Sequence, residues 1–316
     1  MPQQANQPLP DGYQLENYRI ASVLSCGGFS IVYLAYDEND LPVAIKEYLP
    51  SQLALRKEGD ALPSISEENL ATFRYGMRCF FEEGRSLARL SHPNVVRVLN
   101  FFRANETVYM VMRYERGRTL QEHIHAHRGT IKERFIRHVF NLLLNGLREV
   151  HSNKLLHLDI KPANIYIRND NTPVLIDFGA ARQTLVQEGQ RLLSPMYTPG
   201  FAPPEQYKNR DLLGPWSDCY AIGASIFACL ASAAPQAADN RAEKDRYVSA
   251  TKVWNGKYSR QLLETIDWCL ELDHLKRPQS VFALQKVLLR EKDPEVHRKS
   301  SLVARLRSAW MKRIGR

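Results

Sequence analysis

The chain lacks the sequence patterns of a secretory signal, a disulfide framework, a zinc site and a membrane span. Its five cysteines are an odd number without a C-x-x-C pair, which argues against a disulfide framework or a zinc site and fits a reducing compartment. The first twenty residues contain no apolar core, so they do not resemble a secretory signal. The most apolar stretch, residues 219–234, is shorter than the about 18–20 residues of a membrane span and predicts a buried helix. We therefore expect a cytoplasmic protein.

The positive charge of the chain is concentrated at one end. Of the net charge of +9, seven Lys and Arg residues lie between Arg298 and the last residue, where there is no acidic residue. The body of the chain is therefore not marked as a binder of specific nucleic acid. Residues 291–316 read as a basic amphipathic tail. Such a tail is either a terminal helix packed on the body, a disordered basic end, or, in residues 298–316, an interfacial helix drawn to an anionic membrane (the inner membrane face) or to an acidic partner.

Strand patterns dominate the first part of the chain. Residues 18–49 alternate between apolar and polar side chains with turn signals between them, which predicts three antiparallel strands. A helical pattern at 70–90 is followed by two further strand-like runs, 95–102 and 108–114. The polar stretch before the helix, residues 50–69, is predicted to be an extra loop with a short helix. It could serve as a docking surface or as a brake on the following helix, or it could have no function.

Helical periodicity dominates after residue 117. Helices are predicted at 119–127, 131–152, 217–232, 260–272 and 279–290, with short strands at 164–168 and 173–177. The resulting fold class is α+β, with a strand-rich part followed by a larger helical part. The predicted organisation is a polar N-terminal extension over 1–17, a first lobe over 18–114, a second lobe over 115–290 and the tail over 291–316.

A series of short motifs follows one another along the chain. They are a glycine pair between two strands (SCGGFS), VAIK ending at Lys46, a helical Glu83, HLDIKPAN at 157–164, DFG beginning at Asp177, and APPE at 202–205. Each motif alone is weak. In this order they supply a phosphate cover, a lysine, its ion-pair partner, a base and two metal ligands, which is the set of groups that phosphoryl transfer from ATP needs.

From about residue 18 to 289 the chain resembles eukaryotic-type (Hanks-type) Ser/Thr protein kinases. The phrases VAIKEYLP and GFAPPEQY are similar to those of bacterial members. The resemblance implies a two-lobed kinase fold that transfers the γ-phosphate of ATP to protein Ser/Thr hydroxyls, with autophosphorylation, in bacterial signalling. It also implies magnesium as the metal, with manganese as the alternative.

The resemblance gives the central residues their roles. Lys46 would bind the α- and β-phosphates and pair with Glu83, although the neighbouring Glu82 remains a rival for that ion pair. Asp159 would orient the acceptor hydroxyl and accept its proton, and Lys161 would neutralise the charge that develops on the transferred phosphoryl group.

Further roles follow from the same resemblance. Asn164 and Asp177 would hold the metal through oxygen atoms, and His157 would pack against Phe178. The ATP-binding set is Ser25, Gly27, Gly28, Val32, Ala44, Lys46, Met112, Arg113 and Glu115. Of these, Met112 would limit access to the back of the adenine pocket, while Arg113 C=O and Glu115 N–H would bind adenine. The substrate platform would be formed by Thr198, Glu205, Asp218 and Arg277, with Glu205 and Arg277 as a buried ion pair and Asp218 receiving backbone N–H groups of the catalytic loop.

Two departures from the family pattern bear on activity and its control. Of the three glycines in the usual loop, only Gly27 is retained, with serine at positions 25 and 30. Leu158 stands where an arginine usually precedes the catalytic aspartate and binds a phosphate on the activation segment. Thr184 and Ser194 are candidate phosphosites, but the leucine predicts that activity does not depend on the arginine-mediated switch.

These departures keep two alternatives open. A pseudokinase or scaffold would bind nucleotide or partners without turnover, and a small-molecule kinase would use the same chemistry on another acceptor. The complete set of catalytic residues argues against the first, and the substrate-platform residues argue against the second. The sequence does not indicate the protein substrate, the activating signal or the oligomeric state.

Overall fold

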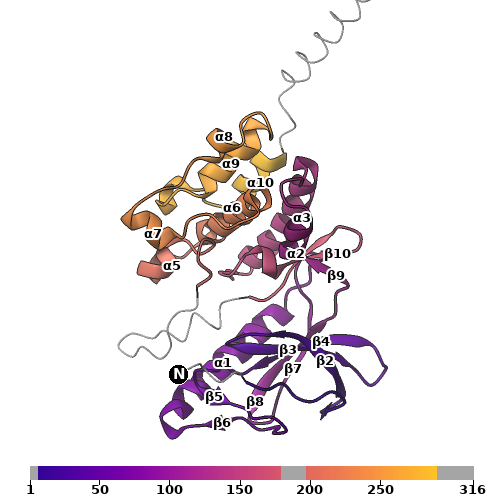
Figure 1. Ribbon diagram of the computed structural model, residues 1–316. Coiled ribbons are helices and arrows are strands. Elements are labelled where there is room, and N and C mark those ends of the chain that lie inside the picture. Colours follow the sequence, from indigo (N-terminus) through magenta and orange to yellow (C-terminus); the bar gives the residue numbers. More distant parts are fainter. Residues whose placement is uncertain (1–5, 179–196, 290–316) are drawn as a thin grey trace, which may run out of the picture.

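The computed structural model describes residues 6–178 and 197–289 as two lobes (Figure 1). Strands and one long helix form the first lobe, and helices form most of the second. This is the two-lobed α+β kinase architecture that the sequence predicts. The candidate phosphosites Thr184 and Ser194 and the basic tail lie outside the described residues.

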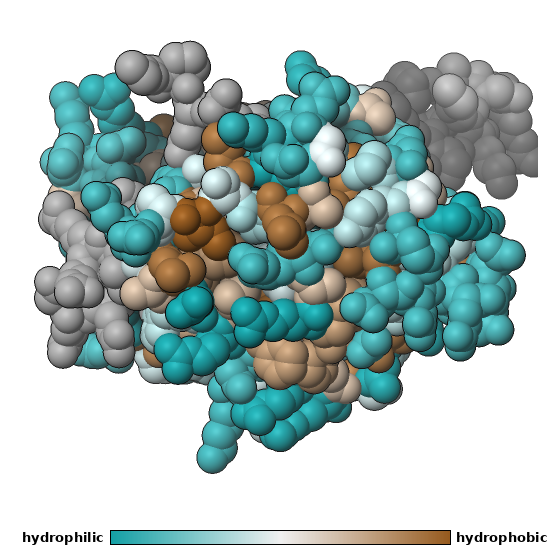
Figure 2. Space-filling model, turned by 90° about the horizontal axis from the view of Figure 1, so that it is seen from below, coloured by the Kyte–Doolittle hydropathy of each residue, from teal (hydrophilic) through white to brown (hydrophobic). Residues whose placement is uncertain are grey.

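The first lobe is built on a six-stranded antiparallel sheet with the strand order β1-β2-β3-β4-β8-β7. The strands are β1 (Gln14–Leu15), β2 (Tyr18–Cys26), β3 (Ser30–Tyr36), β4 (Pro42–Tyr48), β7 (Val98–Ala104) and β8 (Thr107–Arg113). Helix α1 (Glu67–Ala88) packs on β7 and β8 through buried residues that include Phe73, Phe80 and Leu87. The view from the first-lobe end shows a group of apolar side chains bordered by hydrophilic ones (Figure 2).

The N-terminal extension packs on the first lobe from position 6 onward, since Leu9 and Leu15 are both only 1% exposed and β1 pairs with β2. One prediction for the first lobe is wrong. The stretch 50–69 contains a two-stranded ribbon, β5 (Ala54–Leu55) with β6 (Ser64–Ile65), where a short helix was expected. Directly after β5, the side chain of Arg56 is completely buried and forms an ion pair with Glu47 of β4, which anchors the ribbon to the main sheet.

The second lobe surrounds the buried helix α6. Its helices are α2 (Leu120–Ala126), α3 (Glu133–Ser152), α5 (Pro204–Lys208), α6 (Pro215–Ala231), α7 (Ala238–Glu243), α8 (Ala250–Val253), α9 (Arg260–Cys269) and α10 (Val281–Leu289). Helix α6 is buried along nearly its whole length, as its apolar composition predicts. Within residues 6–178 and 197–289, no helix is both long and apolar enough to cross a membrane.

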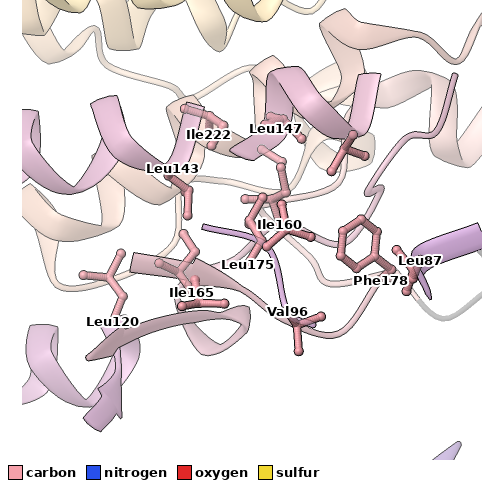
Figure 3. Packing of buried hydrophobic residues seen from close by; sticks show 14 of the residues in the cluster. Leu87, Val96, Leu120, Leu143, Leu147, Ile160, Ile165, Leu175, Phe178 and Ile222 are labelled. Atoms are coloured by element: carbon pink, nitrogen blue, oxygen red, sulfur yellow. The ribbon is translucent and has the colours of Figure 1, made fainter. Parts of the chain in front are cut away.

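A small sheet on the second lobe carries the segments next to the site. Its strand order is β11-β10-β9, with β9 (Gly117–Thr119), β10 (Ile165–Arg168) and β11 (Pro173–Leu175). Ile165 and Leu175 of this sheet point into a core that they share with Leu143 of α3 and Ile222 of α6 (Figure 3). The loop before β10 and the segment after β11 are therefore held on a rigid base.

Candidate functional site

The predicted catalytic loop, residues 157–164, is held in place by one buried carboxylate at the start of α6. Asp218 Oδ1 accepts the backbone N–H of Leu158 at 2.8 Å, and Oδ2 accepts that of His157 at 3.0 Å. His151 Nε2 donates to the same Oδ2 at 2.7 Å. Burial alone raises the pKa of Asp218, but the hydrogen bond and the charge of His151 outweigh it and lower that pKa below its usual value. The carboxylate is therefore ionised, and it accepts three hydrogen bonds.

Leu158 takes a backbone conformation that leucine rarely adopts. Its φ angle is 59°, in the left-handed region where a side chain is strained. The strain persists because the residue is held on both sides. Asp218 binds its N–H group, and Gln206 Nε2 donates to its C=O at 2.8 Å. This turn fixes the direction of the next residue, Asp159.

Asp159 lies at the centre of a network of polar side chains. Lys161 Nζ donates to both carboxylate oxygens, at 3.1 and 2.9 Å. The Thr198 hydroxyl donates to Asp159 Oδ1 at 3.0 Å and accepts from Lys161 at 2.9 Å. Asn164 Nδ2 donates to Oδ2 and to the backbone C=O of Asp159, each at 2.9 Å. The structure thus brings these four predicted site residues together around one carboxylate.

Lys46 reaches across from the first lobe to Asp177. Its side chain is only 5% exposed, and its ammonium group forms an ion pair with the Asp177 carboxylate. Helix α1 presents the two candidate partners of Lys46 differently. Glu83 is buried, whereas Glu82 is half-exposed and pairs with Arg85. The helix phase therefore favours Glu83 over Glu82 as a residue of the site.

His157 packs against Phe178 with ring centroids 4.3 Å apart. Its Nδ1 accepts the backbone N–H of Asp159 at 3.3 Å, so Nε2 carries the proton and donates to Ile176 O at 3.2 Å. Burial lowers the pKa of His157, which keeps the ring neutral. Phe178 in turn lies beside Leu87 of α1 (Figure 3). A buried stack thus connects the catalytic loop with the helix that carries Glu83.

The ion pair predicted for the substrate platform, between Glu205 and Arg277, is present. Arg277 donates to the two Glu205 oxygens at 2.7 and 3.0 Å, and its side chain is fully buried. Ser217 Oγ, in the first turn of α6, also donates to Glu205, at 2.7 Å. This bond joins α5 to α6 next to Asp218, the residue that holds the predicted catalytic loop.

The predicted nucleotide-binding residues lie along three neighbouring strands. Val32 of β3 pairs with Lys46 of β4, and Ala44 of β4 pairs with Met112 of β8. The remaining members lie at the two ends of this surface, with Ser25 in β2, Gly27 and Gly28 in the turn after it, Arg113 at the end of β8 and Glu115 just beyond.

Sequence reasoning missed three residues of the site. Arg168 of β10 forms a bidentate ion pair with Glu115, at 2.7 and 2.8 Å, and so fixes the connection between the lobes. His151 shares the Asp218 carboxylate, and Gln206 holds Leu158. The signal for Gln206 was its place in GFAPPEQY, whereas His151 and Arg168 looked like ordinary polar residues of a helix and a strand.

The residues present fit a divalent cation bound together with phosphates. The side-chain hydrogen bonds of Asn164 within the described part of the chain all use its nitrogen, which leaves the amide oxygen for a hard cation. That nitrogen also lies 3.4 Å from Asp177 O. No group of three or more His, Cys, Asp or Glu that could hold a metal occurs among residues 6–178 and 197–289. Magnesium does not need such a cage, since it usually binds one or two carboxylates, phosphates and water.

Known proteins similar to this chain are protein kinases. Serine/threonine-protein kinase B of Synechocystis sp. is 30% identical over 234 residues, which cover 70% of this chain and 38% of that protein. PrkC of Bacillus subtilis is 29% identical over 222 residues, which cover 69% of this chain and 31% of that kinase. This chain thus spans well under half the length of these relatives.

Solved structures agree with these relatives. The apo form of PpkA-294 is 36% identical, with a TM-score of 0.78, over 89% of this chain and 99% of that one. The kinase domain of Mycobacterium tuberculosis PknI, at 20% identity and a TM-score of 0.65, shares the fold. The protein kinase domain family matches residues 18–289. On the strength of this match, which extends over most of its length, the chain belongs to the protein kinase family.

Proposed function

We propose that the chain is an active Ser/Thr protein kinase that transfers the γ-phosphate of ATP to hydroxyl groups of proteins in bacterial signalling, including its own. The observation that carries this proposal is the network in which Lys161, Asn164 and Thr198 surround the Asp159 carboxylate. Protein kinases use ATP and a divalent metal ion, and we propose magnesium, with manganese as a substitute. The oxygen ligands Asn164 and Asp177 suit either of these hard cations.

Asp159 is placed to act as the catalytic base. Its carboxylate takes the proton of the acceptor hydroxyl as the hydroxyl oxygen attacks the γ-phosphorus and the bond to the ADP oxygen breaks. Lys161 donates to Asp159 at 2.9 Å, and its positive charge stabilises the negative charge on the transferred group. A metal ion held by Asn164 and Asp177 would neutralise phosphate charge.

Lys46 is placed to bind the phosphates of the nucleotide. Its ammonium group is almost fully buried and pairs with Asp177, so it brings positive charge next to the proposed metal ligand. Buried charges act more strongly than exposed ones because water screens them less. Binding energy from the phosphates would then orient the γ-phosphate toward Asp159.

Two rival functions receive less support. A scaffold without turnover is suggested by the degenerate glycine loop and by Leu158, but it does not explain why Lys161, Thr198 and Asn164 converge on the Asp159 carboxylate. A kinase for small molecules does not explain the buried Glu205–Arg277 pair, which joins α5 to the end of the second lobe. The protein substrates remain to be identified.

Replacing the base should abolish phosphoryl transfer. We expect Asp159→Asn to lower the rate by roughly 10²–10⁴-fold, the usual contribution of a general base, while ATP still binds. Transfer of labelled γ-phosphate to the chain itself and to a generic basic protein measures this rate. A wild-type rate no higher than that of the variant would support the scaffold instead.

The hydroxyl of Thr198 should contribute to catalysis through its bridge between Asp159 and Lys161. We expect Thr198→Ala to lower kcat by about 10–100-fold, since hydrogen bonds to charged groups are worth about 1.5–3 kcal/mol. Thr198→Ser keeps the hydroxyl and should retain most of the activity. Equal kcat values for the alanine and serine variants would contradict a role for the hydroxyl.

Activity should not require a phosphate on the activation segment, because the uncharged Leu158 cannot bind one. We expect the double variant Thr184→Ala with Ser194→Ala to retain most of the wild-type kcat, measured on an added protein substrate. The idea is wrong if this variant is inactive and glutamate at the same two positions restores activity.

A further inference from the structure

The tip of the glycine-rich loop is bound by the segment that follows β4. Gly28 O accepts two hydrogen bonds from Ser51, one from its backbone N–H at 2.9 Å and one from its hydroxyl at 3.1 Å. One residue further along the loop, Phe29 O accepts the N–H of Leu49 at 3.0 Å. These bonds continue the β3–β4 ladder beyond its last pair, Ser30 with Tyr48. We call residues 49–51 the clamp.

The clamp fixes the orientation of a peptide group at the tip. A peptide unit is planar and trans, so holding the C=O of Gly28 toward Ser51 directs the N–H of Phe29 the opposite way. The Phe29 ring is buried, 3% exposed, with its centroid 5.1 Å from that of Tyr48. Loop N–H groups are the natural ligands of phosphate oxygens. The direction in which the tip presents its N–H groups is therefore set from behind by the clamp.

The loop has a specific need for such support. The turn is closed by Gly27 N–H donating to Ser30 O at 3.0 Å. Serine at positions 25 and 30 narrows the backbone freedom that glycine would give, but it does not orient the tip. Neither Gly27 nor Gly28 has a positive φ angle, so the shape of the turn does not itself dictate glycine there. The bonds from Ser51 supply the missing orientation.

The clamp is anchored by the N-terminal segment. Asn6 is 5% exposed, and its Nδ2 donates to Leu49 O at 3.1 Å. Its Oδ1 accepts the backbone N–H of Arg56 at 2.7 Å. The turn between the two contacts is closed by Leu53 N–H, which donates to Pro50 O at 2.9 Å. Asn6 thus ties the clamp to Arg56, within the stretch that separates Lys46 from α1.

Arg56 is in turn fixed to the strand that carries Lys46. Its guanidinium group binds both oxygens of Glu47, at 2.6 and 2.7 Å, and both side chains have no exposed surface. The hydroxyls of Tyr33 and Tyr109 also donate to Glu47, at 2.7 and 2.6 Å. A buried ion pair with all its partners present is rigid and costly to break. The chain of contacts therefore runs from the residue next to Lys46 to the tip of the glycine-rich loop.

We propose that residues 49–51 are a clamp that positions the glycine-rich loop over the nucleotide phosphates, with Ser51 as the positioning residue. The N-terminal residues and the 50–69 stretch anchor this clamp. The proposal rests on the proposed kinase function for its kinetic consequences, while the contacts themselves can be tested without turnover. The proposal thus assigns a role to the 50–69 stretch. From the sequence alone, this stretch could be a docking surface, a brake on α1 or a segment without function.

The test compares Ser51→Ala with two controls. Ser51→Thr keeps the hydroxyl, and Ser64→Ala removes an exposed hydroxyl from the same stretch on β6. We expect Ser51→Ala to raise the KM and the Kd for ATP by about 2–10-fold, the value of one hydrogen bond, with little change in kcat. Hydrogen exchange at residues 27–30 should become faster, while both controls behave as wild type.

The anchor is tested in the same way. Asn6→Ala should also speed hydrogen exchange at residues 27–30, and unchanged exchange there would overturn the anchoring role of the N-terminal segment. If Ser51→Ala matches Ser64→Ala in ATP affinity and in exchange, the proposal that Ser51 is the positioning residue is refuted. An inactive wild type would instead refute the proposed function, because nucleotide affinity and hydrogen exchange report on the clamp without any transfer of phosphate.

Discussion

The proposed catalytic site depends on the hydrogen bonds that the Asp218 carboxylate accepts. This carboxylate is buried within the second lobe and accepts three hydrogen bonds, from His151 and from the backbone of His157 and Leu158. An ionised group at such a depth is tolerated only when its hydrogen bonds are complete. These donors belong to the loop and to α3. The same hydrogen bonds therefore stabilise the second lobe and fix the conformation of the loop. The left-handed turn at Leu158 and the direction of Asp159 both follow from them.

The first lobe contains a similar buried carboxylate. Glu47 follows Lys46 in β4 and is buried among Arg56, Tyr33 and Tyr109. In each lobe, then, a buried carboxylate accepts several hydrogen bonds close to a residue for which we propose a role in phosphoryl transfer. The two lobes are joined through Phe178, whose ring packs against His157 and lies beside Leu87 of α1 (Figure 3). Polar networks of this kind reduce stability if a hydrogen-bond partner is missing. When every partner is present, they specify a single geometry. Leu158 fits this arrangement because its backbone, and not a charged side chain, is what the loop uses.

The sequence predicts the strands, the main helices and the central residues of the site, because periodicity and motif order are local signals. It also favours Glu83 over Glu82 by helix phase, which agrees with the burial of Glu83. It does not reveal that Arg56 is buried, because an arginine in a polar stretch normally lies at the surface. Nor does it reveal the contacts of Asn6 with Leu49, of Ser51 with Gly28 and of Arg168 with Glu115, whose partners are 43, 23 and 53 residues apart along the chain. Contacts at that distance leave no periodic trace, so the sequence indicates only a polar N-terminal extension and, at 50–69, a loop with a short helix.

The most direct test of this account is the rate of phosphoryl transfer by Asp218→Asn, measured together with hydrogen exchange at His157 and Leu158. An amide nitrogen in place of one carboxylate oxygen faces donors and cannot accept from them. We expect faster exchange at both backbone positions and a rate lower by about 10–100-fold, the value of hydrogen bonds to a charged group, with the affinity for ATP nearly unchanged. A folded variant with wild-type exchange and a wild-type rate would contradict the claim that this carboxylate holds the catalytic loop in its working shape.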